Sequence, residues 1–183
     1  MRHPPRTQSR RPAPSAAVGT TEQTPNFIAA MRVLARAVVI LTVEVEGQPW
    51  GVTISSCSSL SAAPPRLVCS LESRTVAAAA IAEHGRFGIN ILSAAQAELA
   101  ATSAKAGIPK FLDRALLIHR EDPEVSTPQI ADALYNLDCI VVSRLRIVDH
   151  DLVVGGVRWS KSGPQHDPLL YFNQSFRALD RQA

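Results

Sequence analysis

Hydroxyl-bearing side chains gather in the stretch from Gly51 to Ser61, and their spacing suits the binding of a flat polar ligand. In a strand, successive side chains point to opposite faces. Small side chains on one face let a planar ring lie close to the backbone, and hydroxyl and N–H groups can hydrogen-bond its edge. An ordinary solvent-facing strand is the alternative interpretation. The large apolar face comprises Trp50, Val52 and Ile54, and the small polar face comprises Gly51, Thr53, Ser55 and Cys57.

A second polar group, Ser73-Arg74-Thr75, comes directly before an alanine-rich segment that has the composition of a helix. The first turn of a helix carries unpaired N–H groups and the positive end of the helix dipole, which suit a phosphate. Two hydroxyls and the planar guanidinium of Arg74 add further donors. The simpler alternative is that Ser73 is only an N-cap. Taken together, the two polar groups predict a site for a flattened ring system that carries a phosphate.

Other common catalytic and metal-binding patterns are missing from the sequence. There is no G-x-S-x-G elbow for a serine hydrolase, no H-E-x-x-H, and no G-x-G-x-x-G fingerprint for a separate dinucleotide domain. Histidines 84, 119, 150 and 166 lack the spacing of metal ligands. The three cysteines are an odd number without a C-x-x-C pair, which favours a reducing, cytoplasmic location. We expect Cys69 and Cys139 to be buried core residues.

Composition limits the partners of the chain. Of 183 residues, 46% are hydrophobic and 19% are charged, as expected for one globular domain. The net charge of +3 comes from four arginines in the first 20 residues, and the remaining chain carries −1. The domain therefore has no electrostatic reason to bind nucleic acid. Its longest apolar run, Val76–Ala82, is far shorter than the roughly 20 residues of a membrane span.

The chain divides into a basic tail and one domain. Residues 1–25 are rich in Pro, Ser, Thr and Arg, so we expect them to be disordered, although an organellar transit peptide has a similar composition. Residues 26–183 are expected to fold together. Their periodicity predicts helices over Phe27–Arg36 after an Asn26 cap, Arg74–His84 between a Ser73 cap and Gly85, and Ala94–Ala106. No element is predicted for residues 107–133.

Short strands separate these helices and predict a mainly β domain. Six or seven strands without a βαβ rhythm favour an antiparallel barrel with attached helices. In the longest strand, five apolar residues are expected to share one face: Leu137, Cys139, Val141, Leu145 and Ile147. The predicted strands are 39–45, Trp50–Cys57, Arg66–Leu71, Phe87–Leu92, Leu137–Val148, Leu152–Trp159 and Pro168–Phe172.

In this order, the motifs resemble those of the flavin reductase-like domain family. The resemblance spans about Asn26 to Leu179 and implies a split antiparallel β-barrel of the FMN-binding type with Greek-key-like topology. It is carried by Gly51-x-Thr53-x-Ser55-Ser56, Ser58-x-x-Ser61-x-x-Pro64-Pro65, Ser73-Arg74-Thr75, residues 85–93, Asp149-His150 followed by residues 152–157, and residues 168–171.

The resemblance implies a homodimer that binds FMN or FAD, accepts hydride from NADH or NADPH, and supplies reduced flavin to a partner monooxygenase. The flavin phosphate is expected at Ser73, Arg74 and Thr75, and His150 is expected to place the nicotinamide nucleotide. The ring is expected along Thr53, Ile54, Ser55 and Ser56, with Cys57 and Ser58 near its edge.

Three positions depart from the family pattern: Cys57 replaces an aromatic residue, Gly156 an acidic one, and Ser126-Thr127-Pro128 a Gly-Ala-Pro. Two other functions stay open. One is a catalytically silent flavin-binding module that acts as a carrier, sensor or assembly subunit. The other is an FMN enzyme that acts directly on an organic substrate.

Overall fold

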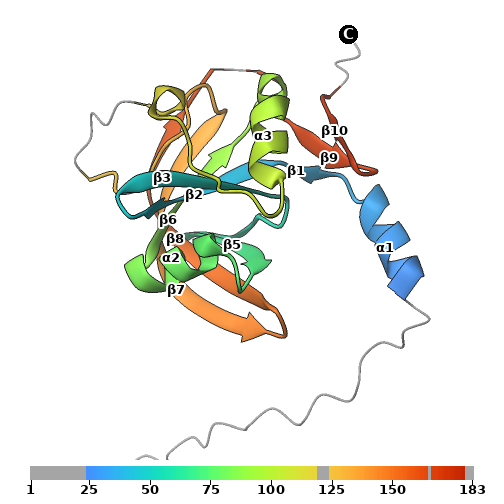
Figure 1. The fold of residues 1–183 in the computed structure, drawn as a ribbon, viewed down its shortest axis with the longest axis horizontal. Helices are drawn as coiled ribbons and strands as arrows, with labels where there is room; N and C mark the ends of the chain where they lie inside the picture. The colour runs from blue at the N-terminus through green and yellow to red at the C-terminus, as the bar shows by residue number, and fades with distance from the viewer. Residues whose placement is uncertain (1–23, 119–123, 165, 180–183) are drawn as a thin grey trace, which may run out of the picture.

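Seven antiparallel strands curl around one core in the computed structural model, which describes residues 24–118, 124–164 and 166–179. Figure 1 shows the curled sheet with β3, one of its edge strands. The other edge strand, β4, comes next in the chain, so the seam of the barrel lies between consecutive strands. This arrangement confirms the predicted split barrel. The strand order is β3-β2-β6-β7-β8-β5-β4, with β2 Val39–Val45, β3 Gln48–Ile54, β4 Ser58–Ala62, β5 Pro65–Glu72, β6 Arg86–Ile91, β7 Tyr135–Ile147 and β8 His150–Ser162.

The interior of the barrel is filled by alternate residues of its strands and closed at one end by α2, Val76–His84. Ala77, Ala78 and Ile81 of α2 are buried in the same core as Phe87 of β6. Gly85 ends the helix in the left-handed conformation, with φ of 66°, as its position predicted. The alanine-rich sequence of α2 is therefore a plug, because small side chains let the helix lie close to the strands.

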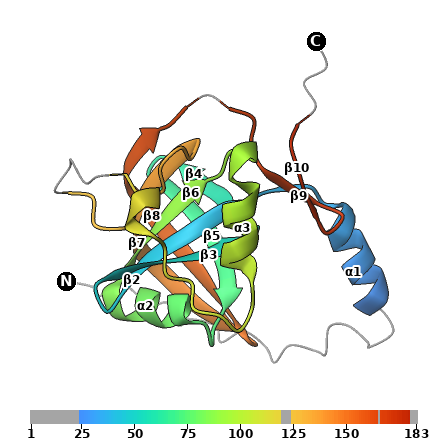
Figure 2. The same cartoon turned by 45° about the horizontal axis from the view of Figure 1, so that its top comes forward.

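A second core covers the outer face of β2 and β3. It packs Ile40 of β2 against Ala100 of α3, Ala97–Ala104, and Leu112 of the following loop. A 3₁₀ turn at Ala94–Gln96 precedes α3. The predicted helix Ala94–Ala106 is thus two shorter elements. A small sheet with the order β1-β9-β10 lies beside this core (Figure 2). Its strands are β1 Arg36–Ala37, β9 Leu170–Phe172 and β10 Ser175–Arg177, and a further 3₁₀ turn spans Arg114–Leu116.

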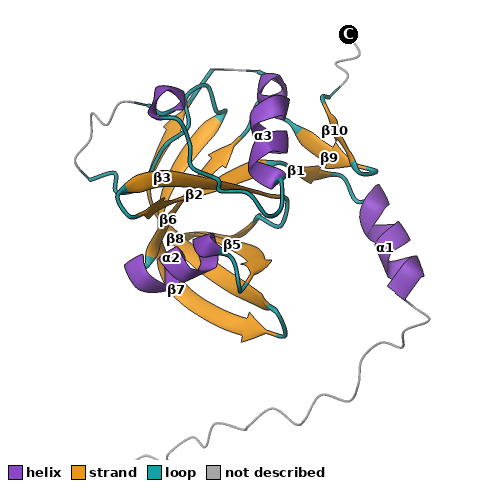
Figure 3. Ribbon diagram, in the orientation of Figure 1, coloured by secondary structure: helices purple, strands orange, loops and turns teal. Residues whose placement is uncertain are grey.

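The first helix stands away from the barrel. Figure 3 shows α1, Thr24–Val33, apart from the strands of the barrel. The helix starts two residues before the expected cap Asn26, and it has no buried residue. Phe27 and Val33 are 63% and 66% exposed. The helix predicted over Phe27–Arg36 is confirmed, but it ends at Val33 and packs against no described part of the barrel core. The tail predicted to be disordered lies, up to residue 23, outside the described residues.

A bulge in β7 reverses the faces of its second half. Val141 pairs with Gly155 and Ser143 with Val154, so Val142 is the extra residue. Beyond it, Leu145 and Ile147 point outward and are 57% and 50% exposed. The prediction that they share the core face of Cys139 is wrong, because one inserted residue shifts the two-residue alternation.

A buried polar network fastens the loop around residues 126–130 to the sheet. Asn90 donates to the Ile40 carbonyl and to Thr42 Oγ1, and it accepts from the Ile130 N–H at 2.8 Å. Thr42 in turn donates to the Pro128 carbonyl at 2.6 Å. The loop thus has fixed polar anchors where the sequence predicts no regular element. Within the described ranges, no helix is long and apolar enough to cross a membrane.

Candidate functional site

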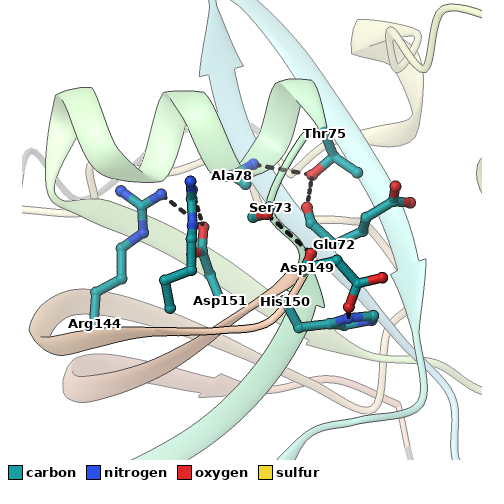
Figure 4. A network of polar contacts seen from close by, with 9 residues as sticks. Glu72, Ser73, Thr75, Ala78, Arg144, Asp149, His150 and Asp151 are labelled. Atoms are coloured by element: carbon teal, nitrogen blue, oxygen red, sulfur yellow. Dashed lines mark hydrogen bonds and ion pairs between the residues drawn. The ribbon is translucent and has the colours of Figure 1, made fainter.

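The end of β5, the start of α2 and the β7–β8 turn meet at one polar corner of the molecule (Figure 4). Ser73 donates from both its N–H and its hydroxyl to the Asp149 carbonyl, each at 2.9 Å. Thr75, and not Ser73, is the N-cap of α2: its hydroxyl accepts from the Ala78 N–H and donates to the Glu72 carbonyl. The predicted cap at Ser73 is wrong because that residue fixes the helix start to the neighbouring turn.

Arg74 projects from this corner into solvent. Within the described ranges, no hydrogen bond or ion pair holds its guanidinium. A hydrogen bond from His150 is the main cause that lowers the pKa of Asp149, and the positive charge of Arg74 lowers this pKa further. Arg74 is therefore an available cation next to the first turn of α2, as a phosphate site requires.

His150 is the first residue of β8, and the turn that precedes it consists of Val148 and Asp149. Its Nδ1 lies 2.8 Å from Asp149 Oδ1, while the rest of the ring is half exposed. Of the two aspartates that flank His150, only Asp149 contacts it, because Asp151 points to the opposite face of the strand.

Asp151 is buried beneath the corner and binds two arginines. Its carboxylate accepts from Arg144 Nη2 at 2.6 Å and from Arg146 Nε at 3.1 Å. Burial acts to raise its pKa, but the hydrogen bonds from Arg146 and Arg144 lower the pKa below the ordinary value. The β7 bulge makes this possible, since it turns both arginines inward. The cluster fixes the hairpin that carries Asp149 and His150.

Replacing Asp151 with asparagine tests this support. We expect Asp151→Asn to lower the free energy of unfolding at neutral pH by about 1–2 kcal/mol, because two partly exposed guanidiniums lose a charged acceptor. The low pKa stabilises the fold above the unfolded value of about 4, and this stabilisation is lost as pH falls through the folded value. In urea titrations, the difference between the variant and the wild type should shrink below about pH 4. Asp149→Asn is the exposed control, and equal losses would contradict the assignment.

The polar face of β3 is covered and does not form an open shelf. Thr53 donates from its hydroxyl to the Ala100 carbonyl of α3 at 2.8 Å. Gly51 lies under Leu112, whose methyl carbon would be 2.9 Å from an added Cβ. The Thr53 hydroxyl and the face of Gly51 are therefore already engaged within the chain, and the assignment of the ring to Thr53 stays a prediction. Ile54 points into the barrel core, so only its backbone could meet a ligand.

Residues 55–57 connect β3 to β4, and their side chains do not continue the alternation of β3. Ser56 is exposed, and its hydroxyl donates to the Ser70 carbonyl and accepts from the Ser70 N–H. Cys57 packs against the barrel core, so it does not share the face of Gly51 and Thr53 as predicted. Ser55 is half-buried and Ser58 is exposed. The change of face follows from the end of β3 at Ile54, where the regular alternation stops.

The open polar surface is the outer face of β4, β5 and β8. Ser70 pairs with Leu152, and Glu72 pairs with His150, so Ser70 and His150 point to the same side of the sheet. Ser56 reaches this side through its hydrogen bonds with Ser70. Ser70 and Ser73 are three residues apart, or roughly 10 Å along a strand. The structure thus brings Ser56, His150 and the helix start together on one surface.

Sequence reasoning missed Ser70. Its place on the polar side of β5 is visible in the alternation of Leu67, Cys69 and Leu71, which are all buried. The sequence does not reveal which strand lies next to the segment that carries Ser56 and Ser58. That neighbour is β5, which pairs with β4.

Two hollows differ in their chemistry. One of about 670 Å³ is lined by Glu44, Glu46 and Glu83 with His84 and Arg86, and its carboxylates would repel a phosphate. The other, of about 330 Å³, opens at the end of the barrel away from α2 and is lined mainly by apolar side chains with Cys57 and Ser58. Among the described residues, no group of three or more potential metal ligands occurs.

The fold and this surface define a class of protein: a split β-barrel plugged by a short helix that begins beside an exposed arginine. The family described as flavin reductase like domain matches residues 31–180. A reductase component of 4-nitrophenol 4-monooxygenase/4-nitrocatechol 2-monooxygenase from Rhodococcus opacus is 37% identical over 142 residues, which are 78% of this chain and 74% of the relative.

Two further relatives agree. An FMN reductase (NADH), RutF 1, from Methylorubrum extorquens is 31% identical over 85% of this chain and 76% of its own. The styrene monooxygenase flavin reductase from Pseudomonas putida S12 has a similar structure, with a TM-score of 0.75, 26% identity, and coverage of 86% of this chain and 100% of that one. The chain belongs to the flavin reductase-like domain family. This confirms the resemblance, the fold and the enzyme class.

Proposed function

We propose that the protein transfers hydride from NADH or NADPH to FMN or FAD and supplies reduced flavin to a partner monooxygenase. The observation that carries this proposal is the surface that joins Ser56, Ser70 and His150 to Arg74 just before the start of α2. Family membership supports the reaction, and the R. opacus relative is itself named as a reductase component. The relatives from Methylorubrum are named for NADH and FMN, which favours this pair.

The residues present fit a flavin phosphate, with roles that differ among them. Ser73 and Thr75 already donate their hydroxyl protons to backbone carbonyls. They therefore shape the site, while Arg74 and the first turn of α2 provide the available positive charge. Ser56 and Ser70 would lie beside the ring, with Ser55, Cys57 and Ser58 along the same segment. Thr53 and Ile54 would hold the end of β3 in place.

When bound, the flavin supplies the hydride acceptor of the reaction. The chain has to bind and orient two planar groups face to face and leave one side of the flavin open to the nicotinamide. His150, at the start of β8, suits this role because its imidazole is half exposed beside the surface. No side chain needs to act as a general acid or base.

One assay separates the active enzyme from a silent flavin-binding module. The full chain is purified, its visible spectrum is recorded, and NADH absorbance is followed with FMN, with FAD and without flavin. We expect oxidation of NADH that depends on added flavin, with NADPH as the parallel donor. A protein that binds flavin but leaves both donors unchanged at every flavin concentration would be the carrier, sensor or assembly subunit instead.

His150 is expected to affect the nicotinamide nucleotide more than the flavin. Its imidazole stands at the open edge of the surface, held by Asp149 at 2.8 Å. We expect His150→Ala to raise the KM for NADH by roughly fivefold, as the loss of about 1 kcal/mol predicts. The affinity for FMN, measured by fluorescence quenching, should change less than twofold. A change in FMN affinity with constant KM for NADH would reverse the assignment. His84→Ala, on the opposite end of α2, is the matched control.

The homodimer is supported by two apolar surfaces that the single chain leaves uncovered. One is the outer stripe of the β7–β8 hairpin with Val142, Leu145 and Ile147, and the other is helix α1. A second copy of the chain would bury both, as symmetric association requires. In sedimentation experiments we expect a dimer, and Leu145→Glu should dissociate it. Ile108→Glu, at an exposed apolar loop residue, should not. A monomeric wild type would contradict the proposal.

A location in the cytoplasm is consistent with the three cysteines, all of which are free. The separation into a tail of residues 1–25 and a domain of residues 26–183 also stays a proposal. Limited proteolysis followed by mass spectrometry would test it. We expect cleavage before residue 26 to leave one resistant fragment.

A further inference from the structure

Two cysteines share the core of the barrel: Cys69 on β5, and Cys57 in the segment just before β4. β4 and β5 pair with Ser58 opposite Val68, and the Ser56 hydroxyl contacts the backbone of Ser70. Cys57 and Cys69 lie between these two contacts, one on each segment, so their backbones run close together. Both side chains belong to the interior, because Cys69 is fully buried and Cys57 packs against the same core.

The backbone geometry suits a disulfide. Ser70 turns its N–H and C=O groups toward Ser56, so the corresponding groups of Cys69 turn the other way, toward Val153 of β8. If the alternation of β5 continues past the start of β4, Cys57 would meet Cys69 as a non-hydrogen-bonded pair, for which the Cα separation in antiparallel strands is roughly 4.5 Å. Disulfides need a Cα separation of about 4.4–6.8 Å. The bond could form with little movement of the strands.

The third cysteine does not meet this requirement with Cys69. Cys139 lies on β7, and β8 separates β7 from β5. Two strand spacings amount to roughly 9.6 Å, which exceeds the limit of about 7 Å for a disulfide. Cys139 is as deeply buried as Cys69, so it is a natural internal control.

Cys57 is the accessible member of the pair. It lines the hollow of about 330 Å³ at the open end of the barrel, while Cys69 lies beneath it. Burial raises the pKa of Cys57 to about 11 and that of Cys69 to about 12. Near neutral pH both sulfurs are protonated, so the reduced pair coexists at short range without repulsion between thiolates. Reaction with oxidants should be slow, because the thiolate is the reactive form.

We propose that Cys57 and Cys69 are a redox pair that hydrogen peroxide converts into a disulfide. The Cys57 sulfur attacks one peroxide oxygen, the O–O bond breaks, and a sulfenic acid and one water form. The Cys69 sulfur then attacks the Cys57 sulfur, the S–O bond breaks, and the hydroxyl leaves as water with the Cys69 proton. Two thiols lose two electrons and two protons, and the peroxide takes up both.

The source of the oxidant follows from the activity and rests on the proposed function. Reduced flavin that no monooxygenase consumes transfers two electrons and two protons to dioxygen, which gives oxidised flavin and hydrogen peroxide. The two cysteines would then be oxidised when the protein reduces flavin that no monooxygenase uses. Ser56 and Ser58 flank Cys57, so the bond would also fix the segment assigned to the flavin ring.

The test uses the full chain, reduced and freed of thiols, then treated with hydrogen peroxide. Free thiols are alkylated under denaturing conditions before digestion with trypsin. The three cysteines fall into separate peptides, 37–66, 67–74 and 121–144. We expect peptides 37–66 and 67–74 to appear joined, two hydrogens lighter than their sum, and to separate after treatment with dithiothreitol. Cys139 should remain fully alkylated. A joined peptide that contains Cys139, or three thiols as free as in the untreated sample, would overturn the proposal.

Variants and turnover complete the experiment. Cys57→Ser should leave Cys69 free after peroxide, whereas Cys139→Ala should form the joined pair like the wild type. Persistent loss of the Cys69 thiol in Cys57→Ser would contradict the assigned partner. In a second arm, NADH, FMN and air replace peroxide, and we expect the same joined peptides, suppressed by catalase. A bond with added peroxide but none during measured NADH oxidation would refute turnover as its source. An absence of NADH oxidation would instead count against the proposed function.

Discussion

Arg74→Ala is expected to weaken FMN binding by about tenfold while leaving riboflavin binding unchanged. The guanidinium is exposed, holds no partner among the described residues, and stands beside the first turn of α2. A charged hydrogen bond to phosphate contributes about 1.5–3 kcal/mol, and exposure to solvent places this case at the lower end. Riboflavin lacks the phosphate, so it isolates the contact. Fluorescence quenching of both ligands measures the two dissociation constants.

Controls make this result specific. Arg86→Ala removes an exposed arginine at the start of β6, beyond the other end of α2, and should change neither affinity. Arg74→Lys should recover part of the lost FMN affinity, since it restores the charge without the planar group. Equal weakening of FMN and riboflavin by Arg74→Ala would show that Arg74 does not bind the phosphate. The assignment of the helix start would then be wrong.

Gly88→Ala should destabilise the fold by about 3 kcal/mol, because it places a methyl group inside the buried polar network. The added Cβ would lie 2.2 Å from Thr42 Oγ1 and 3.0 Å from the Pro128 carbonyl. The Thr42 hydroxyl already links Asn90 to Pro128, so it cannot move without loss of buried hydrogen bonds. Urea unfolding, followed by circular dichroism, measures the change.

Gly156→Ala is the matched control in the same sheet. Its Cβ would lie 3.1 Å from Val142 Cγ2, an exposed side chain that can move. We expect a loss below about 1 kcal/mol. Similar losses in the two variants would indicate that any side chain at a strand glycine is harmful, and that the network around Gly88 has no special role.

The fold was largely predictable because its signals are local. The alternation of β2 and the Glu46-Gly47 turn, with φ values of 51° and 72°, predict the first hairpin, and Gly85 predicts the end of α2. β4 was missed because its serines carry no apolar alternation. The cap of α2 was assigned to Ser73 because Ser73 and Thr75 are equally suitable in sequence. Only the contact of Ser73 with Asp149, far along the chain, decides between them.

The sequence predicted most residues of the candidate site, but it did not predict which face of the sheet is open to a ligand. The start of α2 and His150 were identified, yet the ring was expected on the polar face of β3, which α3 and Leu112 cover. No local pattern reveals that covering, because it comes from segments about 50 residues further along the chain. Ser70 was missed because the sequence does not show that its strand, β5, pairs with β4. Strand neighbours, more than residue types, determine which hydroxyls remain open.

Because Val142 is an extra residue, the two halves of β7 turn opposite sets of alternate side chains toward the barrel interior. Before Val142, the inward side chains of the strand, such as Cys139, pack in the barrel core. Downstream, the same edge delivers arginines to Asp151 and apolar groups to the exterior. Deletion of Val142 would therefore shift the alternation by one residue. Leu145 and Ile147 would then point inward, and Arg144 and Arg146 would point outward. Substitutions at this position are tolerable, whereas a deletion would exchange the inside and the outside of the hairpin.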